Sequence, residues 1–196
     1  MDNSQIDKDA LNLVKENFKI VAERTQNLFA SLVPKQGKFS PTVAIITGSP
    51  SDKEYAHKIR DALQKKYGIP HVDVHCSSAH KSTANTLDLA ARIQQWTSCK
   101  AIIAIAGMSN GLGPVLAANV PIPVISAPPA GDIQTLQADV WSSLRIPSSM
   151  STATVIGADQ SALFAAHIVG NNDAFVWSTI RTAQTYNNVK FLHTTI

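Results

Sequence analysis

The sequence predicts an α/β protein in which helices cover both faces of a doubly wound parallel β-sheet, giving three layers. Two observations carry this prediction. Segments of strand and helix character alternate along the chain, at about 30 residues per β–α–β unit. Two of the strand segments, Thr42–Thr47 and Ala101–Ala106, are almost wholly apolar, which is typical of strands buried on both faces. A chain of 196 residues has room for one such domain and a short appendage.

The first expected element is an amphipathic helix over residues 4–33. Its apolar residues recur at helical spacing, while charges fill the other face. Pro34 would end this helix, and residues 34–41 have the Pro and Gly content of a linker. We therefore expect a helical appendage with its linker over residues 1–40 and the main domain over residues 41–196.

The main domain is expected to alternate five strands with helices. The expected strands span residues 42–47, 72–76, 101–106, 123–126 and 152–156. The expected helices span residues 52–66, 82–96, 112–119, 140–144 and 159–169, and a last helix spans residues 174–189. This pattern is typical of the open sheets of flavodoxin-like and Rossmann-like proteins, here with an extra N-terminal helix and an extra C-terminal helix.

The charged residues are few and unevenly placed. They make up 16% of the chain, against about 25% in an average globular protein. Residues 1–66 carry more than half of them and the whole net charge of +3, so residues 67–196 are poor in charge. A monomer needs charge on its surface, and we therefore expect part of this surface to be buried against other subunits.

Composition also excludes several classes of protein. No apolar run approaches the roughly 20 residues that span a bilayer, and the N-terminus lacks the layout of a signal peptide. We therefore expect a cytoplasmic protein without a membrane partner. The basic excess is small and not clustered, so no nucleic-acid partner is expected. Cys76 and Cys99 lack metal-site spacing and are expected to be buried free thiols.

The segments that follow the first three strands are the candidate site. They are Gly48–Asp52, Ser77–Lys81 and Gly107–Pro114, and in an open parallel sheet ligands bind beyond the carboxyl ends of the strands. Each segment leads into a helix N-terminus, where free N–H groups and the helix dipole favour an anion. Small hydroxylated residues let a phosphate come close, and Lys81 adds a positive charge. We therefore expect a phosphorylated small molecule as ligand.

Each of these signals has a structural alternative when it is taken alone. Ser51 and Asp52 could simply cap a helix, and the segment Gly107–Gly113 could be only a tight turn. A lone histidine at a strand end is more often structural than catalytic. His80 differs because it lies at the site edge of the sheet, between Ser78 and Lys81. The remaining histidines have no such context and are expected to be structural; they are His57, His71, His75, His167 and His193.

Several common sites are excluded by spacing. The chain has no G-x-x-x-x-G-K-[ST] loop for a nucleoside triphosphate. Gly111 and Gly113 lack the third glycine and the acidic residue of a dinucleotide site. Gly107–Gly111 does read G-x-S-x-G, but we do not expect a hydrolase nucleophile, and no cluster of Cys and His indicates a zinc site.

At the three loop segments the chain resembles a known family, the phosphoribosylaminoimidazole (AIR) carboxylases of purine biosynthesis. The resemblance covers about residues 42–170. The matching motifs are G-S-x-S-D at Gly48–Asp52, S-A-H-K at Ser78–Lys81 and A-G-x-S-N-G-L-G-P at Ala106–Pro114, followed by Pro123–Ser126 and Asp139–Arg145.

Within this family the chain is similar to class II, the direct carboxylase branch that is typical of animals. That branch carries S-A-H-K and S-N-G-L-G-P, whereas the mutase branch carries S-A-H-R and a loop with A-A-H-L-P-G. The resemblance implies that a homo-octamer carboxylates AIR at C4 with CO2 to give carboxyaminoimidazole ribonucleotide (CAIR), without ATP, metal or cofactor. Two alternatives stay open: a mutase that starts from the N5-carboxylated nucleotide, and a non-catalytic nucleotide-binding module.

The resemblance also implies roles for individual residues. His80 is the expected base that removes the C4 proton after CO2 has added, since imidazole titrates near neutral pH. Ser49, Ser78 and Lys81 are the expected phosphate contacts. Asp52 is expected to accept hydrogen bonds from the ribose hydroxyls.

The segment that leads into the expected helix over residues 112–119 is expected to hold the CO2. The residues expected to form that pocket are Ser109, Asn110, Gly111 and Leu112. The other expected substrate contacts are Ser51, Ala79 and Gly107. Met108 departs from the animal branch, which carries arginine at this place.

Overall fold

The computed structural model describes residues 12–13, 15–17, 19–20, 41–129 and 131–192. The chain divides into two compact units, Met1–Lys38 and Phe39–Ile196. In the first unit the described residues are helical and exposed, and the rest of the helix expected over residues 4–33 lies outside the described residues. The second unit contains the sheet and all three motif-bearing segments.

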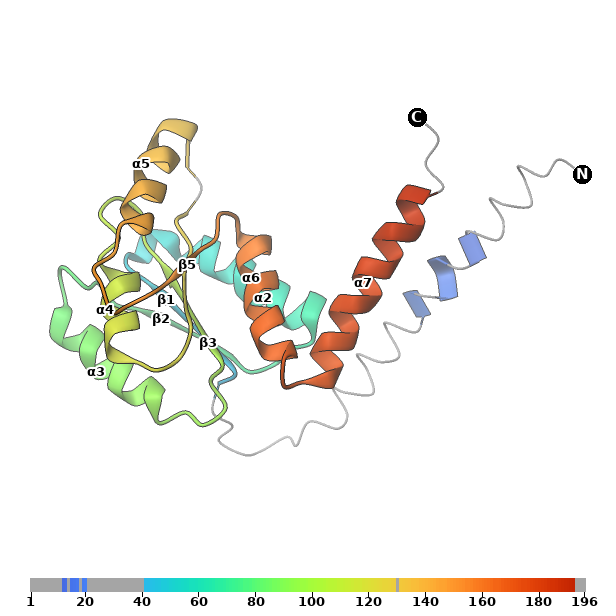
Figure 1. The fold of residues 1–196 in the computed structure, drawn as a ribbon, viewed down its shortest axis with the longest axis horizontal. Helices are drawn as coiled ribbons and strands as arrows, with labels where there is room; N and C mark the ends of the chain where they lie inside the picture. The colour runs from blue at the N-terminus through green and yellow to red at the C-terminus, as the bar shows by residue number, and fades with distance from the viewer. Residues whose placement is uncertain (1–11, 14, 18, 21–40, 130, 193–196) are drawn as a thin grey trace, which may run out of the picture. The chain divides into compact units, whose positions relative to one another are not determined.

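Five parallel strands form the sheet of the second unit (Figure 1). They are β1 (Val43–Thr47), β2 (Val72–Cys76), β3 (Ala101–Ile105), β4 (Val124–Ser126) and β5 (Ala153–Thr154). Their order is β2-β1-β3-β4-β5, and every neighbouring pair is parallel. After β2 the chain crosses back over β1 to form β3, so the winding reverses between β1 and β3, where such sheets bind ligands. The predicted doubly wound parallel sheet is confirmed.

Helices cover both faces of this sheet. The helices of the second unit are the short 3-10 helix η1 (Pro50–Asp52), α2 (Lys53–Tyr67), α3 (Thr83–Gln94), α4 (Leu112–Asn119), α5 (Ile133–Leu144), α6 (Ala158–Gly170) and α7 (Ala174–Leu192). Helices α2 and α6 pack on one face with the start of α7, and α3 and α4 pack on the other. The three expected layers and the C-terminal helix are therefore present.

Alternate residues of β1 and β3 enter two separate cores. Ile45 and Ile103 pack toward α2 and α6, whereas Ile46 and Ile102 pack toward α3 and α4. Every residue of β1 and β3 is buried. Burying a side chain of this size stabilises the folded state by roughly 1.5–3 kcal/mol, so these two strands contribute a large share of the stability of the domain.

Helix α5 is longer than the sequence predicts, because it begins at Ile133 rather than at residue 140. Asp132 caps it: the carboxylate accepts hydrogen bonds from the N–H of Thr135 at 2.9 Å and from the Thr135 hydroxyl at 2.8 Å. Ile133, Leu136 and Val140 recur at helical spacing, so the apolar periodicity was present in the first turns and the prediction began the helix too late.

Strand β5 is shorter than the sequence predicts. It spans only Ala153–Thr154 instead of residues 152–156. The partner strand β4 has three residues, and only two of them pair with β5. Just beyond, Gly157 adopts a φ of 98° and turns the chain into α6, which ends the strand.

Helix α7 has two different halves. Its first half packs on the core through Val176 and Ile180, whereas residues 181–188 are exposed. Although α7 has 19 residues, neither this helix nor any other in the described part of the chain is long and apolar enough to cross a bilayer.

The two cysteines lie in different environments. Cys99 is buried, and burial raises the pKa of its thiol to about 11, so this thiol stays protonated and unreactive near neutral pH. Cys76 is exposed at the end of β2. The expectation of buried thiols is therefore wrong for Cys76, because β2 is an edge strand and Cys76 is its last residue.

Candidate active site

The three motif-bearing segments meet at the carboxyl edge of the sheet. We call Gly48–Asp52 loop one, Ser77–Lys81 loop two and Gly107–Gly111 loop three. The N–H of Gly48 donates a hydrogen bond to the carbonyl of Ile105 at 2.8 Å, and the N–H of Ser77 donates to the carbonyl of Thr47 at 2.9 Å. The start of loop one is therefore hydrogen-bonded to the end of β3, and the start of loop two to the end of β1.

The ring of His80 lies against the backbone of Gly111. A Cβ atom added at Gly111 would lie 2.8 Å from Nε2 and 3.0 Å from Cε1 of His80, so only glycine allows this approach. The imidazole is otherwise exposed. This contact joins loop two to loop three and sets a titratable ring beside the start of α4.

Loop two holds His80 on a tight hydrogen-bonded turn. The N–H of Lys81 donates to the hydroxyl of Ser78 at 3.2 Å, and the N–H of Ser82 donates to the Ser78 carbonyl at 2.9 Å. The Thr83 hydroxyl donates to the carbonyl of Ala79 at 2.6 Å. The Ala79 side chain is buried beneath the turn, so this residue lies within the loop and presents its backbone rather than its methyl group.

Loop one leaves the carboxylate of Asp52 available to a ligand. The hydroxyl of Ser49 accepts from the N–H of Ser51 at 3.3 Å and caps η1. Asp52 stands at the N-cap position of α2 but makes no capping hydrogen bond. Its closest recorded partner is the Ser51 hydroxyl at 3.4 Å. Ser49 therefore supplies the capping hydrogen bond in this loop. The alternative that Asp52 only caps a helix does not account for the position of its carboxylate, which makes no such bond.

The surroundings of Asp52 shift the pKa of its carboxyl upward. Burial raises the pKa of the Asp52 carboxyl, the hydrogen bond from Ser51 opposes this shift, and the negative charge of Asp139 adds to it. Asp139 belongs to α5. Loop one and α5 therefore lie close enough for their carboxylates to repel each other.

Helix α5 holds loop three through three side chains. The N–H of Met108 donates to Oδ1 of Asp139 at 2.6 Å, and the N–H of Asn110 donates to the Ser142 hydroxyl at 2.8 Å. The Asn110 side-chain amide donates to the Ser143 hydroxyl at 3.0 Å. Met108 has a φ of 57°, a left-handed conformation that costs roughly 1–2 kcal/mol for a residue with a Cβ. These hydrogen bonds offset that strain.

Two residues expected to line the CO2 pocket turn their side chains inward. Asn110 is 4% exposed, and its Oδ1 accepts from the N–H of Gly113 at 3.2 Å, which caps the start of α4. Leu112 is 2% exposed and belongs to the core beneath α3 and α4. These two residues can present only backbone groups to a ligand, whereas Ser109 is exposed.

Sequence reasoning missed Asp139, Ser142 and Ser143 as site residues. They lie at positions i, i+3 and i+4 of α5, so they share one helix face. That spacing was the available signal. It was overlooked because the helix was expected to begin at residue 140, which leaves Asp139 outside it.

Lys81 is exposed, and among the described residues its ammonium forms no ion pair. It is therefore available to an anion. The same part of the chain contains no group of three His, Cys, Asp or Glu residues arranged to hold a metal ion.

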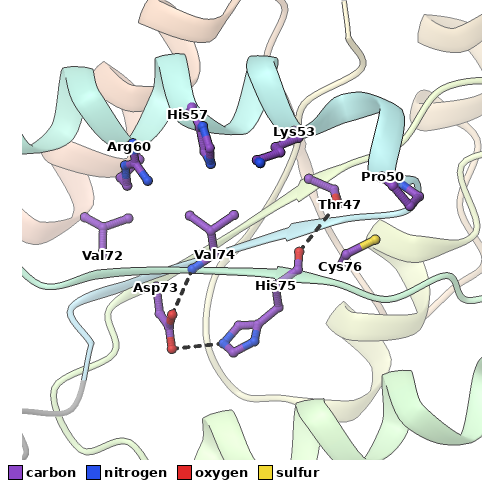
Figure 2. A pocket seen from close by; sticks show the side chains of 10 residues that line it. All are labelled: Thr47, Pro50, Lys53, His57, Arg60, Val72, Asp73, Val74, His75 and Cys76. Carbon is purple, nitrogen blue, oxygen red and sulfur yellow. Dashed lines mark hydrogen bonds and ion pairs between the residues drawn. The ribbon is translucent and has the colours of Figure 1, made fainter.

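A groove of about 460 Å³ runs beside this edge, between α2 and the edge strand β2 (Figure 2). Lys53, His57 and Arg60 of α2 reach toward Val72 and Val74 of β2, and the groove ends at Pro50 and Cys76. Asp73 and His75 project from the other side of β2, where Nε2 of His75 lies in hydrogen-bond contact with Oδ2 of Asp73 at 3.0 Å. The groove touches loop one only at Pro50 and contains none of the predicted site residues.

These features define an open α/β protein with a polar site at the point where the sheet reverses its winding. Residues 42–190 match the model of the family described as AIR carboxylase. A phosphoribosylaminoimidazole carboxylase of Treponema denticola is 33% identical over 152 residues, which cover 78% of this chain and 94% of that protein. The chain belongs to the AIR carboxylase family.

Further comparisons agree with this assignment. The human bifunctional phosphoribosylaminoimidazole carboxylase/phosphoribosylaminoimidazole succinocarboxamide synthetase is 38% identical over 182 residues, which cover 93% of this chain and 41% of that protein. The chain therefore spans less than half the length of the animal relatives that it matches. The crystal structure of Treponema denticola PurE has a TM-score of 0.72 at 33% identity, covering 78% of this chain and 94% of the other.

Replacing Gly111 by alanine should uncouple His80 from loop three. The new methyl group would occupy the place of the imidazole ring, and the exposed ring would swing away. A shift of about 1 Å at a reacting group costs roughly 100-fold in rate. We therefore expect kcat/KM to fall by about 100-fold while the free energy of unfolding changes by less than about 1 kcal/mol.

The matched control is Gly131→Ala. A Cβ at Gly131 would meet only Thr135, at 3.9 Å, so this variant should keep both activity and stability. Steady-state kinetics and thermal unfolding of the two variants measure the difference. Equal activity of both variants would show that the contact between His80 and Gly111 has no role in the reaction.

Proposed function

We propose that this protein carboxylates AIR at C4 with CO2 to give CAIR, a step of de novo purine (IMP) biosynthesis, without ATP. The contact between His80 and Gly111 carries the proposal, because it sets a proton acceptor beside the glycine-rich start of α4. The same edge of the sheet offers hydroxyls, a lysine and a free carboxylate, which suit a phosphorylated ribose.

The chemistry needs one base and a place for a developing carboxylate. The aminoimidazole of AIR is electron-rich, and its C4 attacks CO2 as an enamine carbon. The new C–C bond leaves C4 tetrahedral and still bearing its hydrogen. His80 removes that proton, and the C–H electron pair returns to the ring. The backbone N–H groups of Ser109 and Leu112 stabilise the negative charge on the new carboxylate, since the N–H of Gly111 already donates to the Ser109 carbonyl at 2.8 Å.

The remaining site residues bind the nucleotide. Ser49, Ser78 and Lys81 contact the 5′-phosphate, and Asp52 accepts hydrogen bonds from the ribose hydroxyls. The wall around the substrate is completed by Ser51, Ala79, Gly107, Asn110 and Leu112, of which the last two act through their backbone groups. CO2 is the co-substrate, and the proposal invokes no cofactor.

Two sequence features favour direct carboxylation over the mutase reaction. Lys81 follows His80 where the mutase branch has arginine, and Ser109–Gly113 reads S-N-G-L-G where that branch has A-A-H-L-P-G. The human and rat relatives are both named as phosphoribosylaminoimidazole carboxylases, which supports the same choice. The two free cysteines are typical of a reducing compartment, so we also propose a cytoplasmic location.

We further propose that the protein works as a homo-octamer. Large apolar side chains are exposed on α5 and α7: Ile133 is 76% exposed, Trp141 67% and Leu144 54%, and Trp177 of α7 is 59% exposed. Exposed apolar surface of this kind is typical of subunit contacts. It also gives a reason for the scarcity of charge after residue 66.

An assay with defined substrates tests the reaction. AIR is supplied with bicarbonate and carbonic anhydrase, with and without ATP and the synthetase that makes the N5-carboxylated nucleotide. We expect CAIR from AIR and CO2 alone, because C4 needs no activated carboxyl donor. Dependence on the synthetase would identify a mutase instead, and binding of AIR without turnover would indicate a non-catalytic module.

Replacing His80 by asparagine tests its role as the base. We expect turnover to fall by about 100- to 10,000-fold, the usual contribution of a positioned base, while AIR binding by calorimetry persists. His167→Asn, an exposed change on α6, is the control and should leave both unchanged. A His80→Asn variant that loses binding but keeps its turnover rate would contradict the assignment.

Light scattering after size-exclusion chromatography tests the assembly. The expected mass is that of eight chains, and Trp141→Glu should lower it, because a charge would be buried at an apolar contact. A monomer with native activity would contradict the proposed octamer and leave the charge distribution unexplained, while the enzyme assignment would stand.

A further inference from the structure

One buried carboxylate has no part in the proposed proton transfer, yet it lies directly beneath loop three. Asp139 is 4% exposed, and its Oδ1 accepts the N–H of Met108 at 2.6 Å. Its Oδ2 would lie 2.8 Å from a Cβ added at Gly107. The carboxylate therefore contacts two consecutive residues of the loop.

The contact falls at the most strained point of loop three. Met108 adopts a φ of 57° although it carries a side chain, and this side chain is 84% exposed. Packing of the Met108 side chain therefore does not hold the conformation. What restrains Met108 is the short hydrogen bond from its N–H to the Asp139 carboxylate. Hydrogen bonds to a charged acceptor are about twice as strong as neutral ones.

We propose that Asp139 is a positioning residue for the carboxylation reaction. It holds Met108 in the left-handed conformation, so that the next residues, Ser109–Gly111, stand opposite His80. Ser142 and Ser143 hold Asn110 from the same helix face, but only Asp139 of these three is charged. The inference rests on the proposed function, because it assigns the residue to the geometry of that reaction.

A second observation connects the same carboxylate to the nucleotide subsite. Two groups act on the Asp52 carboxyl: the Ser51 hydroxyl of loop one donates a hydrogen bond to it, and the Asp139 carboxylate of α5 repels its negative charge. Burial and the charge of Asp139 both raise the pKa of Asp52. Neutralising Asp139 should therefore lower the pKa of Asp52, an effect that a purely structural hydrogen bond would not produce.

Kinetics of three variants test the proposal. In Asp139→Ala the loop loses its restraint, and we expect kcat to fall by about 100-fold while KM for AIR changes by less than about threefold, since loops one and two are untouched. In Asp139→Asn the amide oxygen can accept the same hydrogen bond, so most of kcat should return. Asp132→Asn removes a carboxylate from the start of the same helix, can still cap it, and should behave as wild type.

The pH dependence tests the electrostatic effect of Asp139 on the nucleotide subsite, apart from its hydrogen bond to loop three. Ionised Asp52 binds the ribose, so kcat/KM falls as the pH drops through the pKa of Asp52. In Asp139→Asn this acidic limb should move to lower pH, and in Asp132→Asn it should stay in place. If Asp139→Ala does not fold, the exchange rate of the Met108 amide proton in Asp139→Asn decides the positioning role, because a neutral acceptor holds the N–H less strongly and exchange should be faster than in wild type.

The proposal is overturned if Asp139→Ala keeps kcat within about twofold of wild type, whereas an unmoved acidic limb in Asp139→Asn would overturn only the effect of Asp139 on Asp52. A wild-type protein that does not carboxylate AIR refutes the proposed function instead. In that case the exchange rate of the Met108 amide proton, which should be slower in wild type than in Asp139→Ala, still tests the contact. Equal exchange rates would overturn the positioning role as well.

Discussion

Strands β1 and β3 are buried on both faces, and this burial constrains where the other parts of the domain can lie. Backbone groups that are removed from water must find hydrogen-bond partners, so further strands extend the sheet on both sides. Helices must then cover both faces, and every connection to a helix leaves the sheet at the same edge. Loops one and three meet there because the strands before them are neighbours, and loop two follows the strand on the other side of β1.

At this edge the chemistry depends on approaches that leave no room for a side chain. Gly111 admits the ring of His80, and Gly107 admits the carboxylate of Asp139. Glycine is required at both places by the neighbouring side chain rather than by the turn alone. Three segments that are far apart in the sequence therefore come together at one edge of the sheet, and one added methyl group at Gly111 would meet the ring of His80.

Helix α5 connects this site to the surface of the protein. Its inner face holds loop three through Asp139, Ser142 and Ser143, and its outer face exposes Trp141 and Leu144. Under the proposed assembly, the outer face contacts a neighbouring subunit. The packing between subunits and the geometry of loop three would then depend on the position of the same helix, so a loss of assembly would also disturb the reaction.

The sequence by itself determined the parallel sheet, the three loops and the family, because these follow from local signals: apolar runs, turn residues and short motifs. Only the tertiary structure decided which side chains face a ligand. Asn110 and Leu112 share a motif with Ser109 but turn inward, whereas Asp139 reaches the loop from 31 positions away. The physical reason is that the direction of a side chain depends on what packs against it. In loop three that partner is α5, which reaches the loop from a distant part of the chain.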